Sequence, residues 1–194
     1  ARVATANVRT CLPHQETRAY SRVAGTMLLS KVHLLEMQFQ SHGLDFVGIQ
    51  EGRAKSTTEK YGFAYDMLVC AADDLGAQGV QFWHRREKHA RIHQWRAVNP
   101  RLMFIIVDMD AGATRFGAVV GHAPQELSKP CVKDSWWDAL YDTFDSTALK
   151  FPLIPWVFML DANARVGSIE APCFGTAHRD EKNDNGSRLR HFLC

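Results

Sequence analysis

Runs of apolar residues that end on polar side chains recur along this chain. The clearest is Trp156–Asn163, where five apolar residues precede Asp161 and, two positions later, Asn163. An uninterrupted run of this length predicts a strand buried on both faces. Side chains two residues apart in an extended chain point the same way, so Asp161 and Asn163 are expected to project together. The competing interpretation is a turn, because Asp and Asn commonly begin turns and Gly167 follows.

Other predicted strands end in a similar way. Their polar ends are Asn7 in Val3–Val8, Glu51 after Leu44–Gln50, and His122 after Phe116–Val120. The last of these pairs with Leu102–Val107 as a predicted hairpin, because a D-A-G turn signal lies between the two runs. On pattern alone, a structural role for His122 is as well supported as a catalytic one.

Two segments carry the spacing of amphipathic helices. In Ser21–Gln40 the apolar residues recur every three or four positions, and Gly43 is placed to end the helix. Ser135–Leu149 has an aromatic stripe that fits core packing, and Ser135 with Asp138 resembles a capping box.

The remaining segments are predicted with less pattern to guide them. Between Thr57 and Gln81 we expect strands joined by hairpins, followed by a strand at Val80–His84. The polar run Arg179–Ser187 is expected to be loop, and Arg188–Leu193 to begin a helix.

Composition supports one folded domain covering residues 1–194. The chain is 46% hydrophobic and 23% charged, which excludes intrinsic disorder. No stretch approaches the roughly 20 apolar residues that cross a bilayer, and no signal peptide opens the chain, so we expect no membrane association and an intracellular location. Five widely spaced cysteines without a C-x-x-C pair predict neither a disulfide framework nor a zinc knuckle, and favour a reducing compartment.

A net charge of +2 is too small to indicate nucleic-acid binding by itself, so its distribution matters. One basic stretch stands out, against the single acid Glu87: Arg85, Arg86, Lys88, Arg91, Arg96 and Arg101. His89 and His93 would share a helix face and could bind a metal there. A solvated basic strand or loop is the favoured interpretation, because no third ligand is evident.

The polar residues at the strand ends suggest a chemistry. They are Asn7, Glu51, His122, Asp161 and Asn163. Two carboxylates and two amides make a poor zinc site but suit a hard cation such as Mg²⁺, which commonly uses one or two carboxylates together with substrate phosphates. An Asp can deprotonate an attacking water, and an Asn can donate to a phosphate oxygen. Phosphodiester hydrolysis is the reaction this set favours.

Five segments resemble a known family, in order and at similar spacing. They are T-A-N-V-R-T (5–10), D-F-V-G-I-Q-E (45–51), G-H-A-P (121–124), L-D-A-N-A (160–164) and N-D-N-G-S-R-L (183–189). Together they resemble the endonuclease/exonuclease/phosphatase superfamily, and most of all the apurinic-type endonuclease domain of non-LTR retrotransposons.

The resemblance implies a four-layer α/β sandwich and a nuclease that uses Mg²⁺ or Mn²⁺. It implies Glu51 as a metal ligand, Asn7 as the supporting amide, and Asp161 as the residue that activates water. Asn163 would bind phosphate, and His122 would contact the phosphate or assist the leaving group. The basic stretch becomes a candidate for DNA backbone contacts, in a nuclear protein that also carries a reverse transcriptase.

Two departures from the family pattern qualify these expectations. L-D-A-N replaces the family's usual G-D-F-N, and the S-D-H segment that ends the family's domain does not occur before Cys194. We therefore expect a C-terminally incomplete domain whose activity is in question. The alternatives are another phosphatase or phosphodiesterase of the superfamily, with an RNA, nucleotide or phospholipid-type substrate, and an inactive remnant that at most binds nucleic acid.

Overall fold

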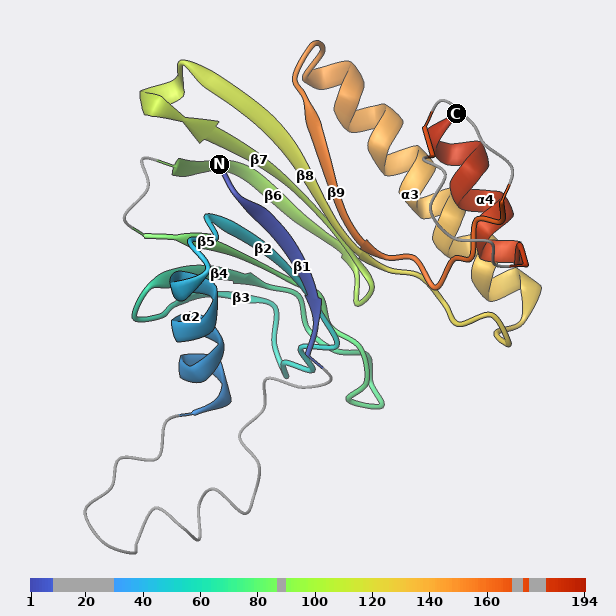
Figure 1. The fold of residues 1–194 in the computed structure, drawn as a ribbon, viewed down its shortest axis with the longest axis horizontal. Coiled ribbons are helices and arrows are strands. Elements are labelled where there is room, and N and C mark those ends of the chain that lie inside the picture. The colour runs from blue at the N-terminus through green and yellow to red at the C-terminus, as the bar shows by residue number, and fades with distance from the viewer. Residues whose placement is uncertain (9–29, 87–89, 169–172, 175–180) are drawn as a thin grey trace, which may run out of the picture.

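The computed structural model describes residues 1–8, 30–86, 90–168, 173–174 and 181–194. Its centre is a pair of mixed β-sheets stacked face to face (Figure 1). The first sheet has the order β1-β2-β5-β4-β3, formed by Val3–Asn7, Phe46–Gln50, Gln81–Arg85, Tyr65–Val69 and Thr58–Tyr61. The second has the order β6-β7-β8-β9, formed by Ala90–Asn99, Leu102–Met109, Thr114–His122 and Trp156–Asp161.

Helices cover the outer faces of both sheets. Helix α2 (Lys31–Ser41) lies against the first sheet, and α3 (Pro130–Lys150) and α4 (Asp184–Leu193) lie against the second (Figure 1). The predicted four-layer α/β sandwich is therefore confirmed. In the described part of the chain, no helix has the length and apolar character needed to cross a membrane.

Alternation along the strands fills the three interfaces between these layers. In β2, Phe46 belongs to a buried cluster shared with the second sheet, whereas Val47 and Ile49 pack with Phe39 of α2. On the outer side of the second sheet, Phe104 of β7 packs with Trp137 of α3. Successive side chains of a strand point to opposite faces, so each central strand contributes to two cores.

The hairpin predictions are confirmed. Strands β3 and β4 pair antiparallel, as do β7 and β8, and a short 3₁₀ helix at Asp110–Gly112 makes the second turn.

The strand at Trp156–Asp161 exists and packs on both faces, but it is less buried than predicted. Strand β9 is at the edge of its sheet, and within it only Met159 is fully buried. Its other residues are partly covered, by α3 on one face and by the first sheet on the other. The run is apolar because both faces contact other layers, even though the strand has one neighbour.

The helix boundaries differ from the predictions. Helix α2 is capped by the Ser30 side chain, and the predicted start at Ser21 lies outside the described residues. The capping box at Ser135 is wrong, because α3 already begins at Pro130, with Lys129 as an N-cap that makes no side-chain bond. Proline is well suited to the first helical position, since its missing N–H would have no partner there.

Helix α4 also begins earlier than predicted. It starts at Asp184, four residues before Arg188, so the expected loop up to Ser187 is wrong over its last four positions. Asn183 caps it, its side chain accepting a hydrogen bond from the Gly186 N–H at 2.7 Å. A capping Asn was the available signal, since Asn is among the favoured N-cap residues.

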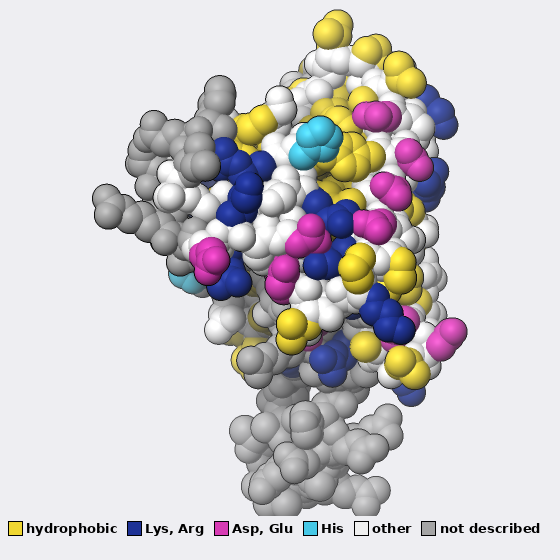
Figure 2. Space-filling view, turned by 90° about the vertical axis from the view of Figure 1, so that its right-hand side faces the viewer, with side chains coloured by type: hydrophobic (Ala, Val, Ile, Leu, Met, Phe, Trp, Pro, Cys, Tyr) yellow, Lys and Arg dark blue, Asp and Glu magenta, His cyan; other side chains and the backbone are white. Residues whose placement is uncertain are grey.

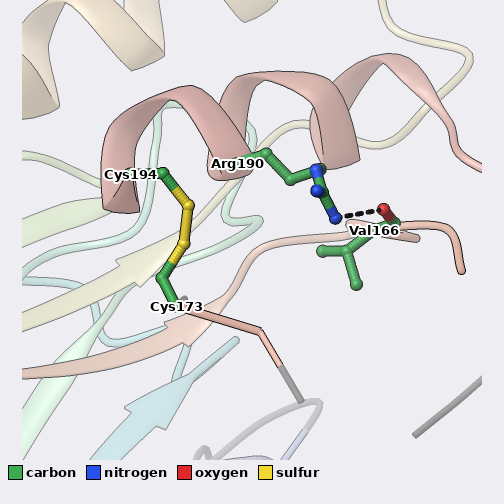
Figure 3. Close-up of a disulfide and its surroundings, with 4 residues drawn as sticks. All are labelled: Val166, Cys173, Arg190 and Cys194. Atoms are coloured by element: carbon green, nitrogen blue, oxygen red, sulfur yellow. Dashed lines mark hydrogen bonds between the residues drawn. A yellow bond between two sulfur atoms is a disulfide. The ribbon is translucent and has the colours of Figure 1, made fainter. Parts of the chain in front are cut away.

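The structure contains a disulfide that the cysteine spacing did not predict. Cys173 and Cys194 are joined, with their Cα atoms 6.1 Å apart (Figure 3). Helix α4 folds back along the segment that follows β9, and this brings the two cysteines together. Disulfides persist in oxidising surroundings, so the cysteines no longer support a reducing compartment.

Candidate active site

The polar strand ends converge at one end of the sandwich. Strands β1 and β2 run parallel with Asn7 opposite Gln50, and β8 and β9 run parallel with His122 opposite Asp161. The side chains of Asn7 and Asp161 bond to each other across the two sheets. Parallel strands finish at the same edge, so stacking the two pairs brings four chain segments to one rim.

The Asn7 amide is at the centre of this rim. Its Nδ2 donates to Glu51 Oε1 at 3.1 Å and to Asp161 Oδ2 at 3.0 Å. One neutral donor therefore holds two carboxylates from different sheets within reach of a single atom. Like charges this close repel, which makes the position between them attractive to a cation.

Glu51 leaves its strand in an unusual backbone conformation. The backbone φ is +55° at Glu51 and +51° at Arg53. The Arg53 guanidinium lies 3.2 Å from Glu51 Oε2. Burial alone would raise the pKa of Glu51, but hydrogen bonds from Asn7 and Arg53 and the nearby positive groups outweigh it and lower the pKa. Glu51 is therefore a stable carboxylate even in mildly acidic solution.

His122 is buried beside Asp161. Its Nε2 lies 3.9 Å from Asp161 Oδ2, and its buried Nδ1 has no hydrogen-bond partner in the structure. Burial and the positive charge of Arg101 lower the pKa of His122, although Asp161 and Glu51 oppose the shift. The neutral imidazole is thus the favoured form at neutral pH.

Asn163 reaches the site by a different route from the one predicted. The extended backbone stops at Asp161, and Asn163 has a φ of +46°, so strand alternation does not set its direction. Its Nδ2 donates to the Ala123 carbonyl at 2.8 Å, and its N–H lies 3.4 Å from Asp161 Oδ1. These contacts tie the loop after β9 to the segment after β8.

Three residues that the strand-end pattern did not single out also take part. Gln50, 1% exposed, donates from Nε2 to the Met159 carbonyl of the opposite sheet at 3.1 Å. Arg53 contacts Glu51, and Arg101 donates to the carbonyl oxygens of His122 and Ala123. Arg101 belonged to the basic stretch, but only the fold places it at this rim. Gln50 could have been found from the sequence, because it is a polar residue within an otherwise apolar strand.

The rest of the basic stretch does not gather at this rim. Arg91 is opposite Asp108 of β7, and Asp108 is opposite Arg115 of β8. Arg115 precedes His122 by seven residues, so Arg91 lies about 20 Å along the strands from the rim. Arg85 ends β5 away from the rim, Arg86 pairs with Asp66, and Arg96 donates to Thr143 of α3. Lys88 and His89 lie outside the described residues.

His93 shares no helix face with a second ligand, because it lies in strand β6 beside Asp108 at 3.3 Å. On the face made by α3 and α4, basic and acidic side chains are intermixed (Figure 2).

The donor set fits an open site for a hard cation. Glu51, Asp161 and Asn7 offer oxygen ligands, which Mg²⁺ prefers, and leave room for water and substrate oxygens. Among the described residues, no group of three or more His, Cys, Asp or Glu side chains could enclose a metal.

Comparisons with known proteins give the fold. No protein-family model and no curated protein sequence matches the chain. The apurinic endonuclease LMAP from Leishmania major matches 97% of the chain with a TM-score of 0.64 and 13% identity. A mannosyl-6-phosphatase from Bacteroides thetaiotaomicron matches 98% with a TM-score of 0.62 and 14% identity. The endonuclease domain of TRAS1, a telomere-specific non-LTR retrotransposon, matches 99% with a TM-score of 0.60 and 15% identity.

The chain spans 64%, 70% and 68% of the length of these three structures, respectively. Nucleases and a phosphatase thus share the arrangement of two stacked sheets with outer helices. The chain has the α/β sandwich fold of the endonuclease/exonuclease/phosphatase proteins.

Proposed function

We propose that the chain is the hydrolytic domain of a Mg²⁺-dependent DNA endonuclease that nicks one strand. The observation that carries this proposal is the pairing of Glu51 and Asp161, from different sheets, on the single amide of Asn7. Such a pair, with Arg53 and Arg101 close by, suits a phosphate group together with a divalent cation. The fold shared with an apurinic endonuclease and a retrotransposon endonuclease favours DNA as the substrate.

The residues divide the chemistry among themselves. Glu51 would hold the metal, and Asn7 would support it through the amide that bridges Glu51 and Asp161. When bound, Mg²⁺ or Mn²⁺ would supply positive charge that polarises a phosphoryl oxygen. Asp161 orients the attacking water and takes its proton.

The other residues act on the phosphate. Neutral His122, with its proton on Nε2, donates to a phosphate oxygen. Arg53 and Asn163 add donors around the same group, and Arg101 adds positive charge close by.

Nicking of supercoiled plasmid tests the proposal. In Mg²⁺, the wild-type chain should convert supercoiled DNA to the open circle, and Asp161→Ala should reduce the rate at least ~100-fold, the usual contribution of a general base. Glu51→Gln should raise the Mg²⁺ concentration needed for half-maximal rate about tenfold or more, because a carboxylate ligand is lost. Asp142→Asn, an exposed position on α3, is the matched control and should behave as wild type. Equal nicking by wild type and Asp161→Ala would remove the proposal.

A phosphomonoesterase is the second candidate, because the Bacteroides thetaiotaomicron mannosyl-6-phosphatase has the same fold. Rates on p-nitrophenyl phosphate and on bis(p-nitrophenyl) phosphate separate the two. Faster release from the diester supports the nuclease, and faster release from the monoester supports the phosphatase.

We also propose that the domain works in the nucleus, within a longer polyprotein that contains a reverse transcriptase; because disulfides are rare in that compartment, Cys173 and Cys194 would be thiols there. A nick would then supply the primer for reverse transcription. The coding sequence downstream of residue 194 tests this, and an open reading frame without a polymerase would contradict it.

A further inference from the structure

We infer that helix α4 is a positioning element that holds the loop after β9 in the geometry the site needs; this inference rests on the proposed function. The loop is defined as residues 163–166. The helix contacts the loop through its cap, its first turn and its last turn.

The cap makes the densest set of contacts. The Asn183 side-chain oxygen accepts from the N–H groups of Arg165 at 2.9 Å and Gly186 at 2.7 Å. Its Nδ2 donates to the Asn163 carbonyl at 3.0 Å, and its own N–H donates to the Arg165 carbonyl at 3.1 Å. One side chain therefore caps the helix and fixes both ends of a three-residue stretch, in which Asn163 has a left-handed backbone.

Gly186 lets the helix approach this closely. A Cβ added at Gly186 would overlap the Arg165 carbonyl oxygen, so no larger residue fits unless the loop moves. One turn further on, Arg190 donates to the Val166 carbonyl at 3.2 Å (Figure 3). The disulfide between Cys173 and Cys194 ties the far end of the helix to a residue that follows the loop in the chain.

Asn185 of α4 also contacts the segment after β8, which follows His122. It is fully buried, accepts from the indole Nε1 of Trp137 at 3.1 Å and donates to the Pro124 carbonyl at 2.7 Å. Ala123 and Pro124 follow His122 in the chain, and the Asn163 amide donates a hydrogen bond to the Ala123 carbonyl. Asn183 at the cap and Asn185 in the first turn of α4 thus set the relative placement of the segments that carry Asp161 and His122.

The exchange of Gly186 for alanine tests this inference. Alanine normally favours a helix over glycine, so a helix without a positioning role would be stabilised by Gly186→Ala. Here we expect faster hydrogen–deuterium exchange in residues 161–166, and a fall in kcat for plasmid nicking of about tenfold or more, because misplacing reacting groups by about 1 Å costs up to ~100-fold. Mg²⁺ affinity, measured by calorimetry, should remain within about twofold of wild type.

Arg188→Ala is the matched control. Arg188 lies on the same helix but pairs with Asp134 and Asp184, away from the loop. It should weaken the contact between α3 and α4 without changing exchange in 161–166 or kcat.

A second variant keeps the inference testable should Gly186→Ala fail to fold. Asn183→Asp retains the helix cap but places an oxygen against the Asn163 carbonyl, so it should lower kcat by about tenfold while the melting temperature changes little. In an Asn163→Ala background, Asn183→Asp should lower kcat much less, since Asn183 acts through the loop that contains Asn163.

Each outcome has a defined meaning. Exchange in residues 161–166 that matches wild type in both α4 variants overturns the inference, as does a loss of kcat no greater than in Arg188→Ala. A wild-type chain that never nicks DNA removes the proposed function, whereas increased exchange in the variants would still show that α4 holds the loop.

Discussion

At the residue scale, the candidate site concentrates uncommon backbone conformations. Glu51, Arg53 and Asn163 have φ values of +55°, +51° and +46°, in a region that side chains larger than glycine rarely occupy. All three lie just past a strand end at the rim. Left-handed residues of this kind persist where surrounding contacts hold them, and they are frequent at functional sites. Here the holding contacts are the bonds of Glu51 to Asn7 and Arg53 and the bonds of Asn163 to Ala123 and Asn183.

The lowered pKa of His122 predicts a pH-dependent contribution to stability. The unfolded chain binds this proton near its ordinary value of about 6.5, whereas the folded chain binds it only at lower pH. The contribution is therefore complete above about pH 6.5 and is lost as the pH falls through the folded pKa.

Urea unfolding of wild type and His122→Gln at several pH values between 8 and 5 measures this contribution. The difference between the two proteins should shrink as the pH falls, because glutamine cannot take up the proton. Burial also lowers the pKa of His84, so the comparison uses the difference between the two proteins rather than either curve alone. A difference that is constant with pH would contradict the assignment.

At the element scale, α4 depends on a covalent tie that local sequence did not reveal. The disulfide closes a loop across a separation of 21 residues and joins the helix end to the chain after β9 (Figure 3). Cross-linking a loop of this size typically stabilises a protein by about 3 kcal/mol, mainly by restricting the unfolded chain.

We expect Cys194→Ser to lower the free energy of unfolding by about 2–4 kcal/mol. Reducing agent should destabilise wild type by a similar amount and leave the variant unchanged. Cys131→Ser is the control, because Cys131 is exposed and unpaired and its loss should have little effect. If reductant does not change the unfolding of the wild type by denaturant, the disulfide does not contribute to stability.

At the scale of the whole molecule, the close approach of the two sheets creates the site. Gly48 of β2 faces the second sheet, and a Cβ there would lie 2.6 Å from the Met159 Cβ of β9. Because real contacts are never this short, only glycine permits this spacing. The spacing also lets Gln50 reach the Met159 carbonyl and Asn7 reach Asp161.

Gly48→Ala should therefore destabilise the protein by about 1–3 kcal/mol, the usual cost of overpacking a core. Chemical denaturation measures this effect, with Gly76→Ala as the comparison. Gly76 lies in open space, so that change reports only the backbone cost of its positive φ. An unchanged stability for Gly48→Ala would show that the sheets can separate freely.

The distribution of positive charge over the molecule leads to a test of DNA binding. Arg53 and Arg101 lie at the rim, whereas Arg91 is near the opposite end of the strands. If DNA phosphates bind at the rim, Arg53→Gln should weaken binding several-fold and flatten its salt dependence, since fewer counterions are released. Arg91→Gln should leave both unchanged, as measured by fluorescence anisotropy at several salt concentrations. The reverse ranking would place the DNA on the β6 edge instead.

The sequence by itself determined the strands that carry the site and four of the polar residues at their ends. Alternation and apolar runs are local properties, so Asn7, Glu51, His122 and Asp161 could be assigned to strand ends before their distances were known. The helix starts were less accessible, because residues such as Pro130 and Asn183 favour a helix start without excluding other positions. The path of Asn163 was not accessible, because its left-handed backbone depends on neighbouring segments.

Only the tertiary structure decided which of these residues meet. Asn7 and Asp161 are 154 positions apart and bond because two sheets stack, and the tie between Cys173 and Cys194 forms because α4 folds back. The same stacking brought Arg101 to the rim and left Arg91 far from it. Contacts of this kind depend on the packing of whole layers, and no pattern within a single stretch of sequence encodes them.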